Sequence, residues 1–300
     1  MSTDFDSGTQ EETTDTDENF ASPTRRFIRQ FAENRLAFFG LVLLGFLLIV
    51  TLLADFIAPY TATQQNSDAV LVGPSLEYPM GTDELGRDIF SRILFGYRII
   101  FSITLGGVAG AFVIGTTVGT AAGYYGGWID ELLMRGVDML MSFPSLILAL
   151  TVVAIIGPSS WGVALALCVA YTPIFARVSR SESVSLSNEE FVRGLQVRGM
   201  STRRILTLHI VPNMMGPLTV ILTLQLAFGI LTTATLSFLG VGIQPPHPSL
   251  GVMVSDGSAY LASSWWQSIF PGIAIMLPVI AFNTIGDGLR DTFDPKEARA

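Results

Sequence analysis

Several residue types are scarce in this chain of 300 residues. It has one cysteine, Cys168, so it cannot form an intramolecular disulfide, and the apolar surroundings of Cys168 indicate a small packing residue. It has one lysine, Lys296, and lacks the G-x-x-x-x-G-K-[ST] pattern, which excludes nucleotide binding through a Walker A loop. Its two histidines, His209 and His247, lie outside the long apolar runs. Without a series of carboxylates or histidines inside those runs, a proton-coupled pump is disfavoured.

Charge is also scarce. Only 14% of the residues are charged and 50% are hydrophobic, and the mean hydropathy of +0.52 is far from that of a soluble globular domain. A bilayer requires about 20 consecutive apolar residues per helix. Six runs reach or approach this length: 36–58, 99–123, 132–156, 161–178, 215–236 and 268–285. The sequence therefore predicts an all-α membrane protein with six transmembrane helices and no soluble catalytic domain. The first run is too long for the apolar part of a cleaved signal peptide, so we expect it to be retained.

The net charge of −8 comes from one end of the chain. Seven acidic residues precede residue 20, where there is no basic residue, and the remainder of the chain is nearly neutral. This stretch has almost nothing to bury, and its composition predicts a disordered acidic tail over residues 1–24.

The basic residues predict the orientation, because lysine and arginine are enriched in cytoplasmic loops. Four arginines precede the first run, which places the N-terminus in the cytoplasm. Alternation then places the long charged segment 178–213 and the C-terminus on the same side. The remaining basic residues, Arg87, Arg92 and Arg98, share the predicted outer loop with three carboxylates. We expect Arg87 to form a local ion cluster with these carboxylates, which are Asp83, Glu84 and Asp88.

The second run is rich in glycine. At about 100° per residue, Gly115, Gly119 and Gly123 share one helix face, while Gly106 and Gly110 lie on another. Such spacing allows close helix approach, and we expect these faces to pack against neighbouring helices. A path for a translocated solute along the first face is the alternative.

Two features of the third run are candidates for a role in the helix bundle or its gate. Asp138 follows Arg135 by three residues, and Glu131 precedes Arg135 by four, spacings that favour an ion network on a helix surface. Pro144 is expected to adjust helix geometry rather than to act as a gate.

The charged segment 178–213 predicts two short helices. Ser187 and Glu190 fit a capping box, which would begin a helix that runs through Arg198 with Glu189 and Arg193 paired on its exposed side. Gly199 would end it in the left-handed conformation. Ser201 or Thr202 would cap a second helix ending before Pro212.

The first of these helices is amphipathic, and the residues alone leave two interpretations. Its arginines suit a helix that lies on anionic lipid head groups. Alternatively, the helix inserts Phe191, Val192 and Leu195 into a groove of a soluble partner.

The segment resembles the cytoplasmic "EAA" loop of ABC importer permeases. The resemblance rests on a predicted helix followed by Gly199 and by a set of matching residues before the next apolar run. These residues are Arg204, Ile205, His209, Pro212 and Asn213. In that family this loop is a coupling helix received by the ATP-hydrolysing subunit. Where the family favours Tyr-Val-Glu-Ala-Ala, residues 191–195 read Phe-Val-Arg-Gly-Leu, so Arg193 and Leu195 depart from the pattern. The resemblance implies contact with the ATPase through Glu190, Phe191, Val192, Arg193, Leu195, Arg198 and Gly199.

Further blocks in the same order, over roughly residues 25–297, are similar to dipeptide/oligopeptide (nickel) permeases, and the first run with its arginines resembles their "C"-type subunit. The blocks lie at 78–92, 123–144, 236–251 and 283–295. The resemblance implies the ABC type I importer permease architecture, with a first helix and outer loop over 25–98 and a five-helix core over 99–297.

The family likeness implies a permease subunit of an ATP-driven importer, with dipeptides or oligopeptides as the favoured substrates and nickel or sugars as alternatives. It implies a second homologous permease forming a heterodimer, two ATP-binding cassette subunits that bind ATP and Mg²⁺, and an extracytoplasmic solute-binding protein. The chain itself is expected to lie in the cell membrane, with no catalytic residue, metal site, bound cofactor or nucleic-acid partner. The alternatives are a stand-alone secondary transporter or channel, and a membrane scaffold whose loop recruits a soluble protein.

Overall fold

The computed structural model describes residues 31–293, so the predicted acidic tail and the last seven residues lie outside it. The described part is nearly all helical, with one isolated antiparallel bridge between Thr82 and Asp88. Its helices are α3 (Arg35–Leu52), α4 (Ala54–Ile57), η2 (Ser67–Ala69), α5 (Ile89–Tyr125), α6 (Gly127–Met141), α7 (Ser145–Ile156), α8 (Ser160–Ser187), α9 (Glu190–Val197), α10 (Thr202–Ile205), the π-helix η3 (Leu206–Ile210), α11 (Val211–Asn213), α12 (Met215–Phe238), α13 (Leu250–Ser258) and α14 (Trp266–Phe293).

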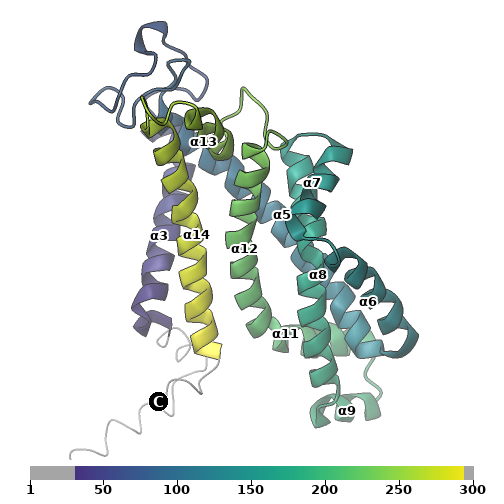
Figure 1. Ribbon diagram of the computed structural model, residues 1–300. Helices are drawn as coiled ribbons and strands as arrows, with labels where there is room; N and C mark the ends of the chain where they lie inside the picture. Colours follow the sequence, from purple (N-terminus) through teal and green to yellow (C-terminus); the bar gives the residue numbers. More distant parts are fainter. Residues whose placement is uncertain (1–30, 294–300) are drawn as a thin grey trace, which may run out of the picture.

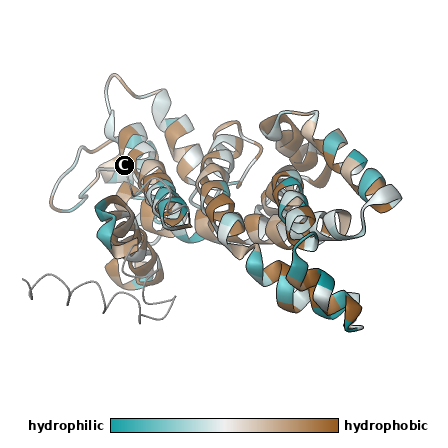
Figure 2. Ribbon diagram, turned by 90° about the horizontal axis from the view of Figure 1, so that it is seen from below, coloured by the Kyte–Doolittle hydropathy of each residue, from teal (hydrophilic) through white to brown (hydrophobic). Residues whose placement is uncertain are grey.

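The long helices stand side by side as one bundle (Figure 1). α3 packs on α14, α14 on α12, and α5 on α8, which form the most extensive helix pair. The loop 58–88 and α13 lie at one end of the bundle, and α9 lies at the opposite end (Figure 1). Hydrophobic residues cover much of the long helices when the bundle is viewed from below (Figure 2). This distribution is expected of helices that face both each other and lipid.

Five described helices are long and apolar enough to cross a membrane: α3, α5, α8, α12 and α14. The third predicted span, 132–156, is not one straight helix, because α6 and α7 are bent by 90° at the break between them. Pro144 is the N-cap of α7. A proline disfavours the α conformation in the residue before it, here Phe143, and has no N–H to continue the helix. Pro144 therefore shapes the chain, as predicted, but by breaking the span.

Two helices extend well beyond the predicted apolar runs. α5 has 37 residues and α8 has 28. At 1.5 Å per residue, α5 is about 55 Å long, whereas the hydrocarbon core of a bilayer is about 30 Å thick. Hydropathy detects only the part of a helix inside that core, so the polar extensions were missed. Asp88 begins α5 by accepting hydrogen bonds from the Ser91 N–H at 2.8 Å and the Ser91 hydroxyl at 2.6 Å.

The glycine-rich face of α5 packs directly on the backbone of α8. A Cβ atom at Gly115 would lie 2.5 Å from the Thr172 carbonyl oxygen, and one at Gly123 would lie 2.6 Å from that of Arg180. A Cβ at Gly119 would overlap the Ala176 carbonyl oxygen. The predicted close packing is therefore confirmed, and α8 occupies the face on which a solute path was the alternative.

The second glycine face of α5 is less crowded. A Cβ at Gly106 would meet nothing within 4 Å, and one at Gly110 would lie 3.0 Å from the Cys168 sulfur. Cys168 is half-buried and packs there as a small residue, as predicted.

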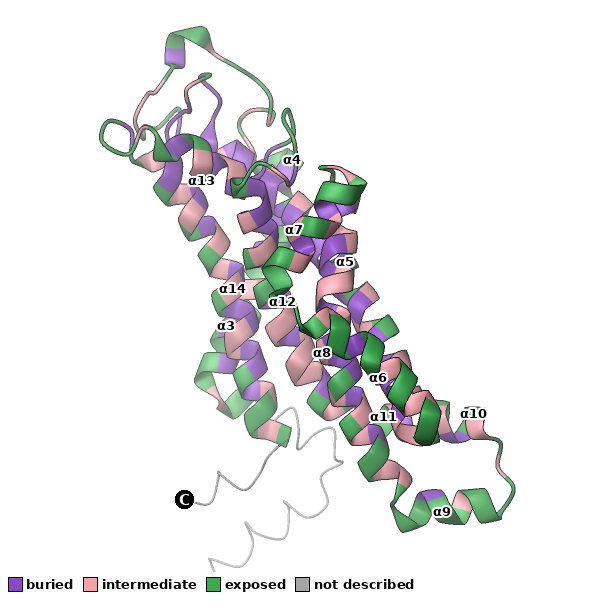
Figure 3. Ribbon diagram, turned by 45° about the vertical axis from the view of Figure 1, so that its right-hand side comes forward, coloured by how far each residue is buried: buried purple, intermediate pink, exposed green. Residues whose placement is uncertain are grey.

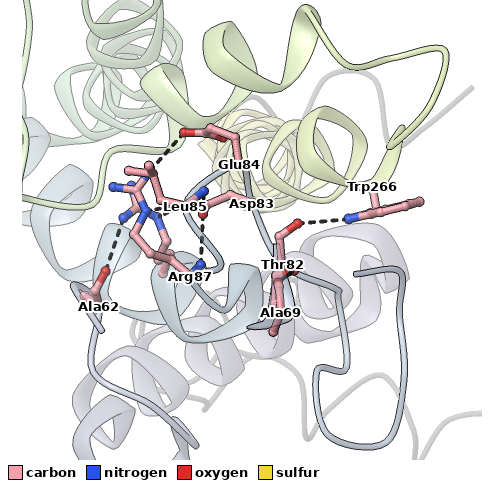
Figure 4. Close-up of polar contacts among 9 residues, drawn as sticks. Ala62, Ala69, Thr82, Asp83, Glu84, Leu85, Arg87 and Trp266 are labelled. Carbon is pink, nitrogen blue, oxygen red and sulfur yellow. Dashed lines mark hydrogen bonds and ion pairs between the residues drawn. The ribbon is translucent and has the colours of Figure 1, made fainter. Parts of the chain in front are cut away.

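The predicted ion cluster of the outer loop is formed in part, since Arg87 pairs with two of the three predicted carboxylates (Figure 4). The third, Asp88, instead accepts hydrogen bonds from Ser91. Arg87 pairs with Asp83 at 2.6 Å and with Glu84 at 3.2 Å, and Arg92 lies 3.7 Å from Asp83. The indole N–H of Trp266 donates to the Thr82 carbonyl at 3.2 Å, which ties the loop to α14. Burial raises the pKa of the Glu84 carboxyl despite the nearby Arg87. The cluster thus holds the loop on the bundle.

The glycine packing predicts that Gly119→Ala destabilises the chain while Gly106→Ala on the same helix does not. The added methyl group would collide with the α8 backbone at position 119, and such overpacking costs about 1–3 kcal/mol. At position 106 it would enter open space. Thermal unfolding of the purified variants in detergent tests this, and equal melting temperatures for the two variants would contradict it.

Candidate coupling site

The segment after α8 lies at the end of the bundle opposite α13 (Figures 1 and 3). α9 is covered mainly by exposed residues, whereas the long helices above it bury much of their facing surfaces (Figure 3). It is therefore a short helix presented outside the packed bundle.

The predicted capping box at the start of α9 is wrong. Ser187 is the last residue of α8, and its hydroxyl donates to the Ser183 carbonyl at 2.6 Å. Asn188 likewise donates to the Val184 carbonyl at 2.9 Å. Glu189 occupies the N-cap position of α9 and makes no side-chain capping bond. Serine and asparagine side chains can bond to nearby backbone groups, and here both side chains bond to carbonyls of α8 instead of capping α9.

The end of α9 is as predicted. Gly199 has φ of +75°, the left-handed conformation that glycine adopts without steric cost. The Met200 N–H donates to the Leu195 carbonyl at 3.1 Å, and the Gly199 N–H donates to the Gln196 carbonyl at 2.9 Å. These two bonds form a Schellman motif, which satisfies carbonyls left free at the helix end.

The second predicted helix does not end before Pro212. Ser201 stands at the N-cap of α10, but its side chain makes no capping bond. The helical chain then passes through the π-helix η3 into α11, which contains Pro212. A proline ring crowds the carbonyl four residues earlier and lacks an N–H. The wider π turn before Pro212 accommodates both defects without ending the helix.

The face that α9 buries differs from the predicted docking face. Val192 is fully buried within this chain, and Leu195 is half-buried against the same core. Val192 therefore anchors α9 and is not available to a partner. The side chains of Phe191 and Val197 are 44% and 89% exposed. The other predicted contact residues are exposed as well: Glu190, Arg193, Arg198 and Gly199.

One side-chain contact ties α9 to α5. The Gln196 amide donates to the Tyr124 hydroxyl at 3.3 Å. The Arg193 guanidinium donates to Asn188 at 3.4 Å, so the predicted pairing with Glu189 is replaced by this contact. Sequence reasoning missed Tyr124 and Gln196, because a contact between residues 72 positions apart has no local signature.

Ion pairs join α6 to α8. Arg180 binds both carboxylate oxygens of Asp130 at 2.5 Å, and Arg177 pairs with Asp138 at 2.8 Å. The predicted network is correct for Arg135 and Glu131, which lie 2.5 Å apart. Asp138 instead pairs with the neighbouring helix. The bidentate pair at Asp130 was not predicted, since it also links distant parts of the chain.

Residues 31–293 contain no group of three or more histidine, cysteine or acidic side chains placed to hold a metal ion. The candidate site is a surface of exposed apolar and basic side chains on α9, which is held on the bundle by Val192 and Gln196.

Comparison with known proteins gives the class of the chain. The family described as "binding-protein-dependent transport system inner membrane component" matches residues 115–299. A second family, "N-terminal TM domain of oligopeptide transport permease C", matches residues 22–74. Together they place the chain among multi-pass membrane permeases.

Curated relatives cover nearly the whole chain. The dipeptide transport system permease protein of Alkalihalophilus pseudofirmus is 42% identical over 275 residues, which are 92% of this chain and 90% of the relative. The di/tripeptide transport system permease protein of Pseudomonas aeruginosa is 36% identical over 283 residues, which are 92% of this chain and 93% of the relative. The glutathione transport system permease protein of Escherichia coli is 39% identical over 276 residues, which are 92% of this chain and 91% of the relative.

The chain belongs to the inner-membrane components of binding-protein-dependent transport systems, and its fold is that of the type I ABC importer permeases. It is a multi-pass protein of the cell membrane and a permease subunit, a class that works with ATPase and binding-protein partners. The fold class and the family predicted from the sequence are thereby confirmed.

The backbone of Gly199 predicts a local effect of substitution. No atom lies within 4 Å of a Cβ built at Gly199 or at Gly194, so crowding plays no part at either position. A left-handed residue other than glycine costs roughly 1–2 kcal/mol, and a β-branched residue is among the least tolerant. In Gly199→Val, amide hydrogens of residues 190–200 should exchange about tenfold faster, since 1.4 kcal/mol corresponds to a factor of ten. In Gly194→Ala they should exchange more slowly, because alanine favours the helix interior. Unchanged exchange in Gly199→Val would refute this account of the helix end.

The Asp130–Arg180 pair predicts a measurable coupling energy. In a double-mutant cycle with Asp130→Asn and Arg180→Gln, we expect a coupling of about 1 kcal/mol, because the pair is bidentate and partly buried. The same cycle on Glu131 and Arg135 should give a value near zero, since both side chains are more than 60% exposed. Thermal unfolding measures both cycles, and equal couplings would contradict the assignment.

Proposed function

We propose that the chain is the "C"-type permease subunit of an ATP-driven importer of dipeptides or oligopeptides. Relatives that match over nine-tenths of the chain support this substrate class, since they are named as permeases for dipeptides, di/tripeptides and glutathione. The structural observation that carries the proposal is α9, an exposed helix braced against the bundle at one end. This geometry suits a helix that binds a partner outside the membrane and transmits the partner's conformational change to the bundle.

In this proposal α9 is the coupling helix that docks into a groove of a partner ATPase. Phe191 and Val197 supply exposed apolar surface, and Arg193 and Arg198 flank it with positive charge. A helix bound in a groove takes most of its affinity from a few apolar anchors, while charged neighbours contribute specificity. The groove is therefore expected to be apolar at its base with acidic groups at its rim.

The two departures from the family pattern have different consequences. Leu195 packs against the core of this chain, so it belongs to the base that holds α9. Arg193 is exposed, and it reverses the charge that the family favours at this position. We infer that the partner ATPase presents a complementary acidic group opposite Arg193.

The packing of α9 provides a path for mechanical coupling. Val192 and the Gln196–Tyr124 contact hold α9 on the ends of α5 and α8. α5 and α8 are in backbone contact along the glycine face, and Arg180 holds α6 through Asp130. A displacement of α9 would therefore move α5, α6 and α8 together. Such rigid-body motion against the α3, α12 and α14 group would switch the bundle between two access states, which is the form that coupling between sites takes.

The proposed orientation places α9 and both termini in the cytoplasm. Arginines concentrate toward that end, which agrees with the enrichment of basic residues on the cytoplasmic side. Those in the described part are Arg35, Arg135, Arg177, Arg180, Arg193, Arg198, Arg203, Arg204 and Arg290. The loop 58–88 and α13 would then face the binding protein.

The complete transporter would contain a second homologous permease, two ATP-binding cassette subunits and an extracytoplasmic solute-binding protein. ATP and Mg²⁺ would bind to the cassette subunits, and this chain would bind no cofactor. The binding protein would largely select the substrate.

The docking role predicts that Val197→Asp weakens binding of the ATPase to this chain. Val197 is 89% exposed, so the substitution should leave the fold intact while placing a charge in an apolar contact. We expect co-purification of the ATPase and transport-stimulated ATP hydrolysis to fall about tenfold or more, the size of a hot-spot loss. Leu76→Asp is the matched control for ATPase co-purification, since Leu76 is fully exposed in the loop at the end of the bundle opposite α9.

Two outcomes would contradict the proposal. Normal ATPase retention in Val197→Asp, together with normal retention in Phe191→Asp, would remove α9 from the contact. Peptide uptake into liposomes by this chain alone, driven by an ion gradient and without ATP, would favour a secondary transporter.

A further inference from the structure

A small polar cavity lies at the outer end of the bundle, remote from α9. Four parts of the chain meet around it: the outer loop, the start of α5, α13 and the start of α14. Its volume is about 10 Å³, which is the room required for roughly one water molecule. Its lining residues are Asp83, Glu84, Arg87, Ile89, Arg92, Met253, Asp256 and Gln267.

Two of the lining side chains are buried with polar atoms that no protein group satisfies. Gln267 is 2% exposed, and neither its amide oxygen nor its amide nitrogen has a hydrogen-bond partner. Arg92 is 3% exposed, and its Nε has no hydrogen-bond partner. The nearest carboxylate oxygen, Asp83 Oδ2, lies 3.7 Å from that nitrogen, beyond hydrogen-bond length. Buried polar groups in folded proteins are nearly always bonded to protein or to ordered water.

We propose that this cavity is a binding site for a single ordered water molecule. The unsatisfied groups include both kinds of hydrogen-bonding partner. Arg92 Nε and the Gln267 nitrogen are donors, and the Gln267 oxygen is an acceptor. This mixture holds whichever way the amide is turned.

The mixture selects water over an ion of similar size. An anion would accept from the two donors and leave the Gln267 oxygen without a partner. A cation would satisfy that oxygen and lie against two donors. Water both accepts and donates, so one molecule can bond to Arg92 and to either end of the amide while donating to a carboxylate. The carboxylates of the lining do not call for a cation, because Asp83 and Glu84 are already paired with Arg87 (Figure 4) and the third, Asp256, is exposed to solvent.

The water would join helices that the protein itself connects only weakly at this point. Gln267 is on α14 and Arg92 is on α5, and the direct hydrogen bond between these helices, from the Tyr97 hydroxyl to the Ala274 carbonyl at 2.7 Å, lies farther along both. The loop is tied to α14 by the Trp266–Thr82 bond. A bridging water makes a hydrogen bond nearly as favourable as a direct one. The proposed water thus bridges α5 and α14 near the outer loop and adds hydrogen bonds between them.

X-ray hydroxyl-radical footprinting of the intact importer tests the proposal, because an ordered water generates radicals beside the residues it contacts. Met253 lines the cavity and is 7% exposed, and Met214, fully buried elsewhere, is the control. We expect Met253 to be oxidised several-fold faster than Met214, and to slow to the Met214 rate in Gln267→Leu. Equal rates in the unmodified protein, or an unchanged Met253 rate in Gln267→Leu, would overturn the proposal.

A density map of the unmodified importer gives a second test that needs no variant. We expect one peak within hydrogen-bond distance of the Gln267 amide and Arg92 Nε. An empty cavity would overturn the proposal. So would an anomalous signal at the site from crystals grown in rubidium or bromide, since it would identify an ion.

Discussion

The close approach of α5 and α8 is the constraint on which the rest of the structure depends. Glycines on α5 leave no space for a side chain, so the backbones of the two helices are in contact. Between apolar helices in a membrane, association relies on packing and small residues allow it. This contact aligns the far ends of both helices, Tyr124 on α5 and Ser187 on α8, where α9 begins. Polar contacts then attach the neighbouring helices: Arg180 of α8 binds Asp130 of α6, and Gln196 of α9 donates to Tyr124 of α5.

The two ends of the bundle use charge differently. At the end of the bundle that carries the loop 58–88, Arg87 and Arg92 are buried among carboxylates of the loop and hold it on α5. At the opposite end, Arg193 and Arg198 are exposed on α9. Buried ion pairs that keep their partners favour one defined arrangement, whereas exposed arginines contribute little to stability and remain available for recognition. The same residue type therefore holds the loop at one end and presents a surface at the other.

Much of this protein follows from local patterns in its sequence. The hydrophobic runs predicted membrane helices, the glycine spacing predicted the packed face of α5, and Gly199 predicted the end of α9. Each depends on residues that are close together in the chain. The family likeness was also readable from the order of short blocks, and the comparisons confirmed it.

Tertiary structure decided what local patterns leave open. Ser187 was available for a capping box, but α8 continues far enough to take its hydroxyl. Val192 was a plausible docking residue until the bundle buried it, and the partner of Asp138 is Arg177 rather than its helix neighbour. Pro144 marked a place where helix geometry changes, but the 90° angle between α6 and α7 at this break was not evident from the sequence. The sequence by itself determined which segments are helical and apolar and where α9 ends, since these depend on local backbone preference and side-chain hydropathy. Only the fold decided which face of α9 is free, because burial depends on residues far apart in the chain.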